Sequence, residues 1–306
     1  TGNIAEFIIY INMLTWPVTS IGWVASIIQR AAASQKRINE FLQTNPDIQD
    51  QPGSDRQNIE GHIQFNQVQF DYPDTGIKAL NTLSFELNKG EKLAIIGRTG
   101  SGKTTIADLI LRMYDIEAGK GQITIDHKDI QQHQLSKLRN SIAYVPQDVF
   151  LFSDTVRSNI VLGDDSISDE AILKAAAAIG ISEFIEGLPD GLDYNVQERG
   201  GVLSAGQRQL LAFLRAYITN PAVLILDEAT SSIDSHTEEL IQRALIALTK
   251  NRTSVIIAHR LSTIQHADRI IVLDKGRVVE MGSHQQLLEK AGAYYNLYEK
   301  QFASVE

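Results

Sequence analysis

The longest hydrophobic run of the chain lies near its start. Residues 4–28 read IAEFIIYINMLTWPVTSIGWVASII and contain one charged residue, Glu6. As a helix this run is about 37 Å long at 1.5 Å per residue, which exceeds the ~30 Å hydrocarbon layer of a membrane. The pattern therefore predicts a transmembrane helix, and the alternative is a buried helix of a soluble domain.

The charges that flank this run favour a membrane span over a signal peptide. A signal peptide carries positive charge ahead of a short apolar core, whereas Arg30, Lys36 and Arg37 follow a long one. If the helix spans a membrane, this asymmetry places its C-terminal side in the cytoplasm. Because the chain begins with Thr1 rather than Met, we expect it to be a fragment of a longer protein.

Beyond the apolar run, the pattern divides the chain into three parts. We expect residues 1–45 to form the last transmembrane helix and its cytoplasmic extension, residues 46–58 a polar linker, and residues 59–306 a second domain. In that domain short apolar strands alternate with helical patterns, which is typical of an α/β fold with a parallel central sheet. The expected strands are 62–70, 83–87, 92–96, 121–125, 142–145, 223–226, 254–258 and 269–273, and the expected helices are 103–113, 169–179, 204–218, 235–248 and 283–299.

Composition and charge narrow the possible functions. With 43% hydrophobic and 21% charged residues, the chain has the composition of a globular protein. Its net charge of −9, without a run rich in Lys and Arg, argues against a nucleic-acid partner. The absence of cysteine excludes disulfides, cysteine zinc sites and thiol catalysis, and the seven histidines lack the spacing of metal ligands. We therefore expect no structural metal.

A glycine-rich loop follows the expected strand at 92–96. It reads Gly97-Arg98-Thr99-Gly100-Ser101-Gly102-Lys103-Thr104 and fits the phosphate-binding motif G-x-x-x-x-G-K-[ST]. The glycines permit a tight turn whose N–H groups point at phosphate oxygens. We expect Lys103 to reach the β- and γ-phosphates and the Thr104 hydroxyl to ligate Mg²⁺. The loop therefore predicts a nucleotide site.

A fully apolar strand pattern at 223–226 ends in two carboxylates, Asp227 and Glu228. Such a run suits a central strand that is buried on both faces. We expect Asp227 to hold Mg²⁺ directly or through water, and Glu228 to polarise an attacking water as a general base. The alternative is an ordinary strand end, which can have the same pattern. The presence of the phosphate-binding motif at 97–104 favours the functional interpretation.

Residues 203–207 read LSAGQ and introduce another expected helix. Ser204 and Gln207 have the spacing of an S-x-x-Q capping box. The N–H groups at the helix start, together with the serine hydroxyl, suit an anion. On spacing alone, a capping box that only starts a helix is the alternative.

Taken together, these motifs resemble the nucleotide-binding domain of an ATP-binding cassette (ABC) transporter. LSAGQ resembles the family signature LSGGQ, with Ala205 in place of the first glycine. Other segments resemble its Q-loop (144–148, with Gln147), D-loop (231–234), switch histidine (258–260, with His259), aromatic loop (70–72, with Tyr72) and the segment that exporters place against their coupling helices (198–200). The resemblance covers residues 59–306, and the apolar helix ahead of them makes the C-terminal part of an exporter-type half-transporter the nearest match.

The resemblance implies a P-loop NTPase fold of the ABC type. It implies a parallel core sheet, an antiparallel β subdomain and a helical subdomain at about 150–220, preceded by the transmembrane helix. It also implies a subunit of a membrane exporter that hydrolyses ATP, with its nucleotide-binding domain in the cytoplasm. The implied cofactors are ATP and Mg²⁺, and the implied partners are a second ABC subunit, a transmembrane domain and the lipid bilayer.

The resemblance also implies a composite ATP site between two subunits. One subunit contributes Tyr72, which stacks on adenine, the loop from Gly97 through Thr105, and Asp227. The other covers the nucleotide with Ser204, Gly206 and Gln207. Around the γ-phosphate, Glu228 orients water, His259 contacts the phosphate, and Gln147 lies at the metal and reports its state to the membrane domain. Asp234 couples the two sites.

Two other functions stay open beside the exporter. A soluble ABC ATPase acting on nucleic acid would use the same cassette, but the acidic balance and the apolar run argue against it. A non-hydrolysing partner subunit of a heterodimer would bind ATP only. The presence of Glu228 and His259 argues against that reading, whereas Ala205 in the signature keeps it open.

Overall fold

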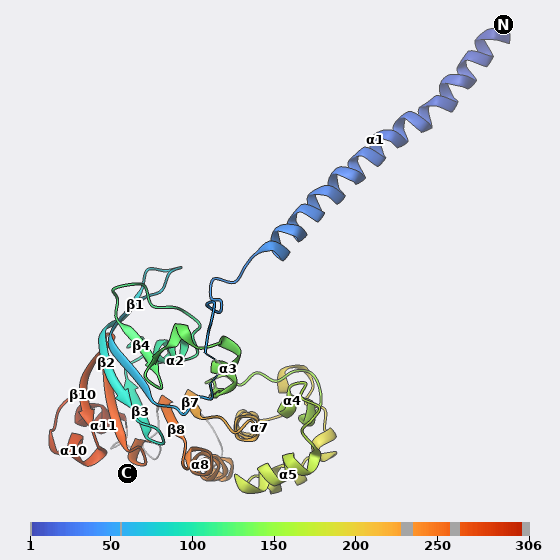
Figure 1. Ribbon diagram of the computed structural model, residues 1–306. Coiled ribbons are helices and arrows are strands. Elements are labelled where there is room, and N and C mark those ends of the chain that lie inside the picture. The colour runs from blue at the N-terminus through green and yellow to red at the C-terminus, as the bar shows by residue number, and fades with distance from the viewer. Residues whose placement is uncertain (1, 56, 228–234, 258–263, 302–306) are drawn as a thin grey trace. The chain divides into compact units, whose positions relative to one another are not determined.

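A computed structural model describes residues 2–55, 57–227, 235–257 and 264–301 of the chain (Figure 1). It divides into two compact units, Thr1–Gln49 and Asp50–Glu306.

The first unit contains one long helix, α1 (Gly2–Gln43), which includes the expected apolar run and its polar continuation. None of its residues is buried, and large apolar side chains such as Trp16, which is 77% exposed, cover its surface. Among the described residues, α1 is the one helix long and apolar enough to cross a membrane. An exposed apolar surface of this extent marks a contact with lipid or with other protein segments.

The second unit contains two sheets. The larger has the strand order β10-β9-β3-β8-β7-β6, and its strands are β3 (Lys92–Gly97), β6 (Ile142–Val145), β7 (Val223–Asp227), β8 (Thr253–Ile257), β9 (Arg269–Asp274) and β10 (Arg277–Gly282). All neighbouring pairs are parallel except β9–β10, so the core sheet is parallel with one antiparallel edge strand. The smaller sheet is antiparallel, with the order β2-β1-β4-β5, and its strands are β1 (Ile63–Asp71), β2 (Lys78–Leu87), β4 (Gln122–Ile125) and β5 (Lys128–Asp129). This arrangement confirms the expected fold class.

Alternation along the central strands builds two hydrophobic cores. All five residues of β7 are buried. Val223 and Ile225 face the core shared with the smaller sheet, whereas Leu224 and Leu226 face the core formed with the helices. The side chains of successive residues point to opposite faces of a strand. The fully apolar run at 223–226 is therefore the sequence signature of a strand covered on both sides.

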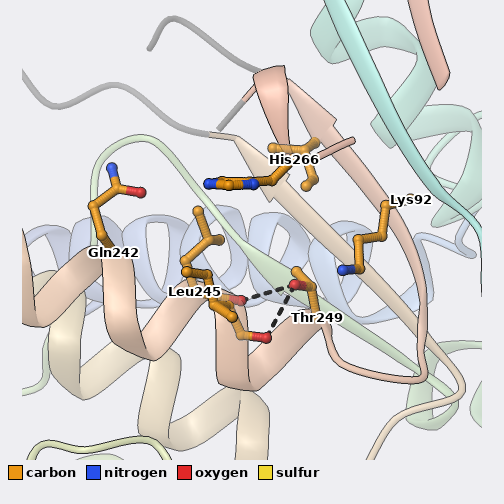
Figure 2. A pocket seen from close by; sticks show the side chains of 7 residues that line it. Lys92, Gln242, Leu245, Thr249 and His266 are labelled. Atoms are coloured by element: carbon orange, nitrogen blue, oxygen red, sulfur yellow. Dashed lines mark hydrogen bonds between the residues drawn. The ribbon is translucent and has the colours of Figure 1, made fainter. Parts of the chain in front are cut away.

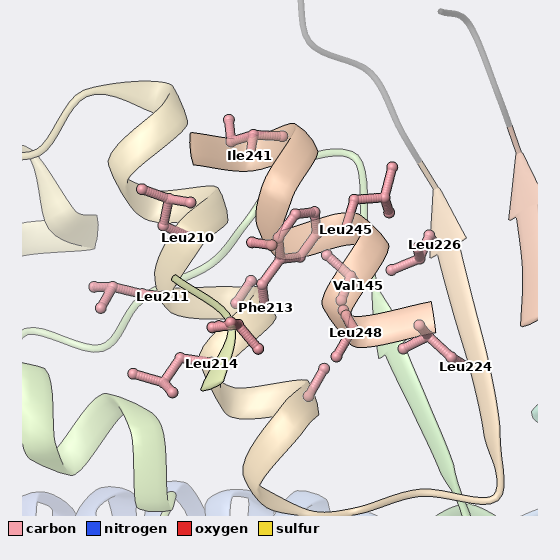
Figure 3. Packing of buried hydrophobic residues seen from close by; sticks show 14 of the residues in the cluster. Val145, Leu210, Leu211, Phe213, Leu214, Leu224, Leu226, Ile241, Leu245 and Leu248 are labelled. Carbon is pink, nitrogen blue, oxygen red and sulfur yellow. The ribbon is translucent and has the colours of Figure 1, made fainter. Parts of the chain in front are cut away.

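Helices cover the core sheet and fill the segment between β6 and β7. They are α2 (Lys103–Ile110), α3 (Leu135–Asn140), α4 (Val156–Val161), α5 (Asp169–Ala178), α6 (Ser182–Glu186), α7 (Ala205–Ile218), α8 (Ser235–Thr249), α10 (His284–Glu289) and α11 (Ala293–Gln301). Figure 3 shows how α7 and α8 pack over β7: Phe213 and Leu245 lie between the helices, and Leu224 and Leu226 point at them from the strand. This packing fixes the carboxyl end of β7, where the acidic residues follow.

The structure departs from the expected elements mostly at amphipathic edges. Strand β2 begins at Lys78 rather than at residue 83, and β10 was not expected because its residues are only partly buried or exposed. The helix expected at 283–299 is two helices, α10 and α11. Between them Ala291 has a φ of +47°, which a continuous right-handed helix cannot contain.

Part of the polar stretch that we expected to be a linker is attached to the second unit. The Asp50 carboxylate accepts a hydrogen bond from the Leu135 N–H at 2.6 Å, and Asp55 forms an ion pair with Lys128. The backbone of Asp55 donates to Gln132 O at 2.7 Å. Contacts to both side chain and backbone hold this part of the chain against the start of α3.

Candidate functional site

The phosphate-binding loop connects β3, a central strand of the core sheet, to the start of α2. Gly97 is the last residue of β3, and Gly102 is the N-cap of α2 with a φ of +101°. Gly102 has no side chain that could cap the first N–H groups of the helix. Uncapped N–H groups at a helix start carry partial positive charge and bind anions. The loop therefore offers N–H groups for the phosphate that its sequence predicts.

Lys103 lies inside this loop rather than at its surface. Its side chain is 7% exposed, and Nζ donates to Gly97 O at 2.9 Å and to Arg98 O at 3.0 Å. Burial lowers the pKa of Lys103, and the nearby Asp227 carboxylate opposes this shift. Two carbonyl oxygens of the loop thus hold the Lys103 ammonium in place, and its positive charge has little contact with solvent.

Ser101 supplies a further polar group in the loop. It is 4% exposed, and among the described residues its Oγ has no hydrogen-bond partner. A buried hydroxyl without a partner costs free energy unless a ligand or water satisfies it. This observation favours a polar ligand in the loop.

Asp227 reaches the loop from the carboxyl end of β7. Thr104 Oγ1 donates to Asp227 Oδ2 at 3.2 Å, so two of the three expected metal ligands are neighbours. Hydroxyl and carboxylate oxygens are the ligands that Mg²⁺ prefers, and the residues present therefore fit the metal. Burial, with a smaller contribution from the negative charges of Asp227 and Asp108, raises the pKa of Tyr144 on β6 to about 12.

Tyr72 approaches α2 from the antiparallel sheet. It directly follows β1, and its hydroxyl lies 3.0 Å from Thr105 Oγ1 and 3.3 Å from Asp108 Oδ2. Its ring is perpendicular to the ring of Tyr114 at a centroid distance of 5.4 Å. The structure thus brings Tyr72 to the helix that follows the loop. Sequence reasoning missed Asp108, although an acidic residue three positions after Thr105, on the same face of the helix, was a usable signal.

The signature segment forms the start of α7 and contains the expected capping box. Ser204 Oγ accepts from the Gln207 N–H at 3.2 Å, and Gln207 Oε1 accepts from the Ser204 N–H at 2.9 Å. Ser204 and Ala205 are exposed, whereas Gly206 is buried. The methyl group of Ala205 thus lies at an exposed position of the helix start. No hydrogen bond or ion pair in the described part of the chain joins residues 203–207 to the loop at 97–105.

Several expected site residues lie beyond what the structure describes. Glu228, Asp234 and His259 are outside the described residues. Gln147 is described: it follows β6, the strand beside β7, and its side chain is exposed. Among the described residues no hydrogen bond joins Gln147 to Thr104 or Asp227. Its proposed role at the metal thus rests on the resemblance alone.

A groove of about 670 Å³ opens next to Gln147. Its lining includes Tyr144, Val149, Phe150, Phe152 and Arg215. Phe150 and Phe152 are 53% and 57% exposed, and their rings are perpendicular at a centroid distance of 5.2 Å. Arg215 Nη2 is buried and has no hydrogen-bond partner among the described residues. The groove thus offers exposed aromatic surface and an unused hydrogen-bond donor.

A second cavity, of about 220 Å³, lies beside α8 (Figure 2). Its lining includes Lys92, Gln242, Thr249 and His266. The Thr249 hydroxyl donates within its own helix, to the carbonyl oxygens of Leu245 and Ile246. Lys92 is the first residue of β3, whereas the phosphate-binding loop follows the last. The cavity therefore lies at the opposite end of the strand and is not part of the nucleotide site.

A parallel core sheet with a glycine-rich loop after one strand, and with an acidic residue at the end of another, defines a nucleotide-binding protein of the P-loop class. Comparison with known proteins narrows this class: a sequence profile described as ABC transporter matches residues 80–231. The chain is 48% identical over 304 residues to YknV, an uncharacterised ABC transporter ATP-binding protein of Bacillus subtilis, covering 99% of this chain and 50% of YknV. The chain belongs to the ABC transporter family and carries its ATP-binding domain.

Two further matches have names that state a function. An ATP-dependent lipid A-core flippase of Pseudomonas fluorescens is 44% identical over 298 residues, which cover 97% of this chain and 49% of the flippase. The solved structure of a bacterial Atm1-family ABC exporter with ATP bound matches with a TM-score of 0.85 and 38% identity, covering 97% of this chain and 52% of the exporter chain. The chain thus spans about half the length of the relatives that it matches.

Proposed function

We propose that this chain is the C-terminal part of an ABC exporter subunit that hydrolyses ATP to drive transport across a membrane. In this proposal residues 1–45 form the last transmembrane helix and its cytoplasmic extension, residues 46–58 the linker, and residues 59–306 the nucleotide-binding domain. The exposed apolar surface of α1 and the similarity to exporters over both parts of the chain support this organisation. The subunit would lie in the cell membrane, with its nucleotide-binding domain in the cytoplasm.

In the proposed ATP site, the loop and the start of α2 bind the phosphates. The backbone N–H groups of the loop and the ammonium of Lys103 face the negative charge of the triphosphate. Thr104 and Asp227 would hold Mg²⁺, which neutralises phosphate charge when bound. Ser101 adds a hydroxyl group, Thr105 contributes its backbone N–H, and the Tyr72 ring would stack on the adenine.

The site becomes complete when a second subunit supplies its signature helix. This step is supported by the described residues of one chain, in which no hydrogen bond or ion pair joins the capped start of α7 to the phosphate-binding loop. An exposed helix start with a serine hydroxyl is suited to an anion, and the γ-phosphate held by a facing subunit is that anion in our proposal. Binding ATP then favours the closed dimer, and loss of the γ-phosphate releases it.

Hydrolysis in this proposal depends on residues that follow β7 and β8. Glu228 would orient and deprotonate the attacking water, which typically contributes about 10²–10⁴-fold to a rate. His259 would contact the γ-phosphate, and Asp234 would couple the two sites of the dimer. Gln147 would communicate the state of the site to the membrane domain.

The groove beside Gln147 is the proposed docking site for the membrane domain. Phe150 and Phe152 provide apolar contact area, and Arg215 is among the residues that line the groove. Exposed aromatic pairs and arginines are typical centres of protein interfaces. The groove would thus connect the ATP site to the helices that move the cargo.

The test of this function is ATP hydrolysis by the protein in lipid nanodiscs. We expect the wild type to hydrolyse MgATP, and Lys103→Ala and Glu228→Gln to abolish most of that activity. Activity that survives both substitutions would contradict the proposed site. Stoichiometric ATP binding without any turnover of the wild type, alone or mixed with a candidate partner, would support the non-hydrolysing subunit instead.

A further inference from the structure

A polar contact holds the hydroxyl end of Tyr72 against α2. Its hydroxyl lies 3.0 Å from Thr105 Oγ1 and 3.3 Å from Asp108 Oδ2. Thr105 is buried, and Tyr72 and Asp108 are half-buried, so solvent only partly competes for these groups. The contact joins the antiparallel sheet to the helix of the phosphate-binding loop.

The chemistry of the three groups allows one consistent arrangement of protons. A tyrosine hydroxyl has one proton to donate and can also accept, whereas an ionised carboxylate only accepts. Tyr72 therefore donates to Asp108 and accepts from Thr105. In this arrangement each of the three oxygens has a partner, and the tyrosine hydroxyl is fixed in two directions.

Aromatic packing restrains the rest of the Tyr72 side chain. Phe70 is perpendicular to the ring at a centroid distance of 5.1 Å, and Tyr114 at 5.4 Å. Edge-to-face pairs of this kind are each worth about 0.5–1.5 kcal/mol beyond their buried area. Two ring neighbours alone still permit the ring to tilt, and the bond at the hydroxyl end removes that freedom.

We propose that Asp108 is a positioning residue that sets the orientation of the Tyr72 ring for the nucleotide base. This inference rests on the proposed stacking of Tyr72 on adenine. Asp108 affects the base through Tyr72. The triphosphate is bound by the loop and not by Asp108. In this proposal, recognition of the base depends on Asp108 of α2, the helix that begins at the phosphate-binding loop.

A different role for Asp108 must be separated from this one. Burial raises the pKa of Asp108, and the negative charge of Asp227 raises it further. Asp108 is therefore electrostatically coupled to a proposed ligand of Mg²⁺. A substitution that acted through the metal would change the affinity for any magnesium-bound triphosphate, with or without a base.

The experiment compares MgATP with magnesium tripolyphosphate, which has no base, by calorimetry on the protein in nanodiscs. We expect Asp108→Ala to weaken MgATP binding about three- to tenfold, the range that the loss of one typical net hydrogen bond gives, and to leave tripolyphosphate binding unchanged. Asp108→Asn retains an acceptor oxygen and should bind MgATP like the wild type. In a Tyr72→Phe background, Asp108→Ala should have no further effect.

Two results would overturn the inference: equal weakening of both ligands by Asp108→Ala, or unchanged MgATP binding in that variant. Unchanged tripolyphosphate binding also reports that the variant is folded. If Asp108→Ala fails to fold, Tyr72→Phe decides, because it keeps the ring and loses only the hydroxyl; wild-type MgATP binding by this variant overturns the inference. Tyr72→Ala separates the two proposals: if it leaves MgATP binding unchanged, base stacking itself is wrong, whereas a large loss there with a silent Asp108→Ala rejects only the role of Asp108.

Discussion

Gly102, at the start of α2, is the position where a single added methyl group tests the loop geometry most sharply. Its φ of +101° is a conformation that residues with a side chain rarely adopt, and a Cβ there would lie 2.5 Å from Ala79 O and 2.9 Å from Leu80 Cδ2. Gly100 provides the matched control. It has a φ of +77° in the same loop, and a Cβ there would meet nothing within 4 Å.

The difference between the two alanine variants isolates the steric contact. Both variants incur the left-handed strain of about 1–2 kcal/mol, and both regain about 0.4–1 kcal/mol from a less flexible unfolded chain. Only Gly102→Ala must also move the loop or β2, because an ordinary contact begins at 3.4 Å. Overpacking of this kind costs about 1–3 kcal/mol. For a domain of this size, that corresponds to a melting temperature lower by roughly 2–12 °C than that of Gly100→Ala.

The assays are thermal unfolding and ATP turnover of both variants in nanodiscs. A shift of the phosphate-binding N–H groups by nearly an ångström is expected to reduce turnover on the order of 10²-fold in Gly102→Ala. Gly100→Ala should retain more activity and a higher melting temperature. Equal melting temperatures and equal turnover in the two variants would refute the proposed packing of the loop against β2.

Three further predictions concern the other parts of the site. Lys103→Ala removes the ammonium from the loop and should abolish tight ATP binding; unchanged affinity in calorimetry would contradict this. Ser204→Ala should weaken ATP-driven dimerisation, whereas Ser283→Ala, which breaks a matching capping box at α10, should only lower stability by about 1 kcal/mol; equal dimerisation of both variants in light scattering would remove the role of Ser204. Glu228→Gln should slow hydrolysis by about 10²–10⁴-fold while ATP still binds, and near-normal turnover in a phosphate-release assay would reject it as the general base.

The central strands and the phosphate-binding loop could be predicted because their signals are local. The run at 223–226 is apolar on both faces of β7, and the spacing of the loop residues is a property of eight consecutive positions. The capping box of Ser204 and Gln207 was predictable for the same reason, since both partners lie within one helical turn. Local patterns of this kind do not depend on how distant segments pack.

The contacts made by distant segments could not be predicted in the same way. Tyr72 and Asp108 are separated by 36 positions, and their contact depends on how the antiparallel sheet lies against α2. Strand β10 has no clear alternation because it is an edge strand with partly exposed residues. The break before α11 does carry a signal, because Gly292 directly follows Ala291 and glycine is common at helix ends.

The most direct test asks whether ATP joins two of these domains. The chain contains no cysteine, so Lys174→Cys, at an exposed position of α5, provides one site for a spin label. In the Glu228→Gln variant in nanodiscs, pulsed electron paramagnetic resonance should give one short, narrow distance between the labels of two subunits with MgATP, and a longer, broader distribution with MgADP. The same distribution with both nucleotides would contradict the claim that the γ-phosphate holds two copies together.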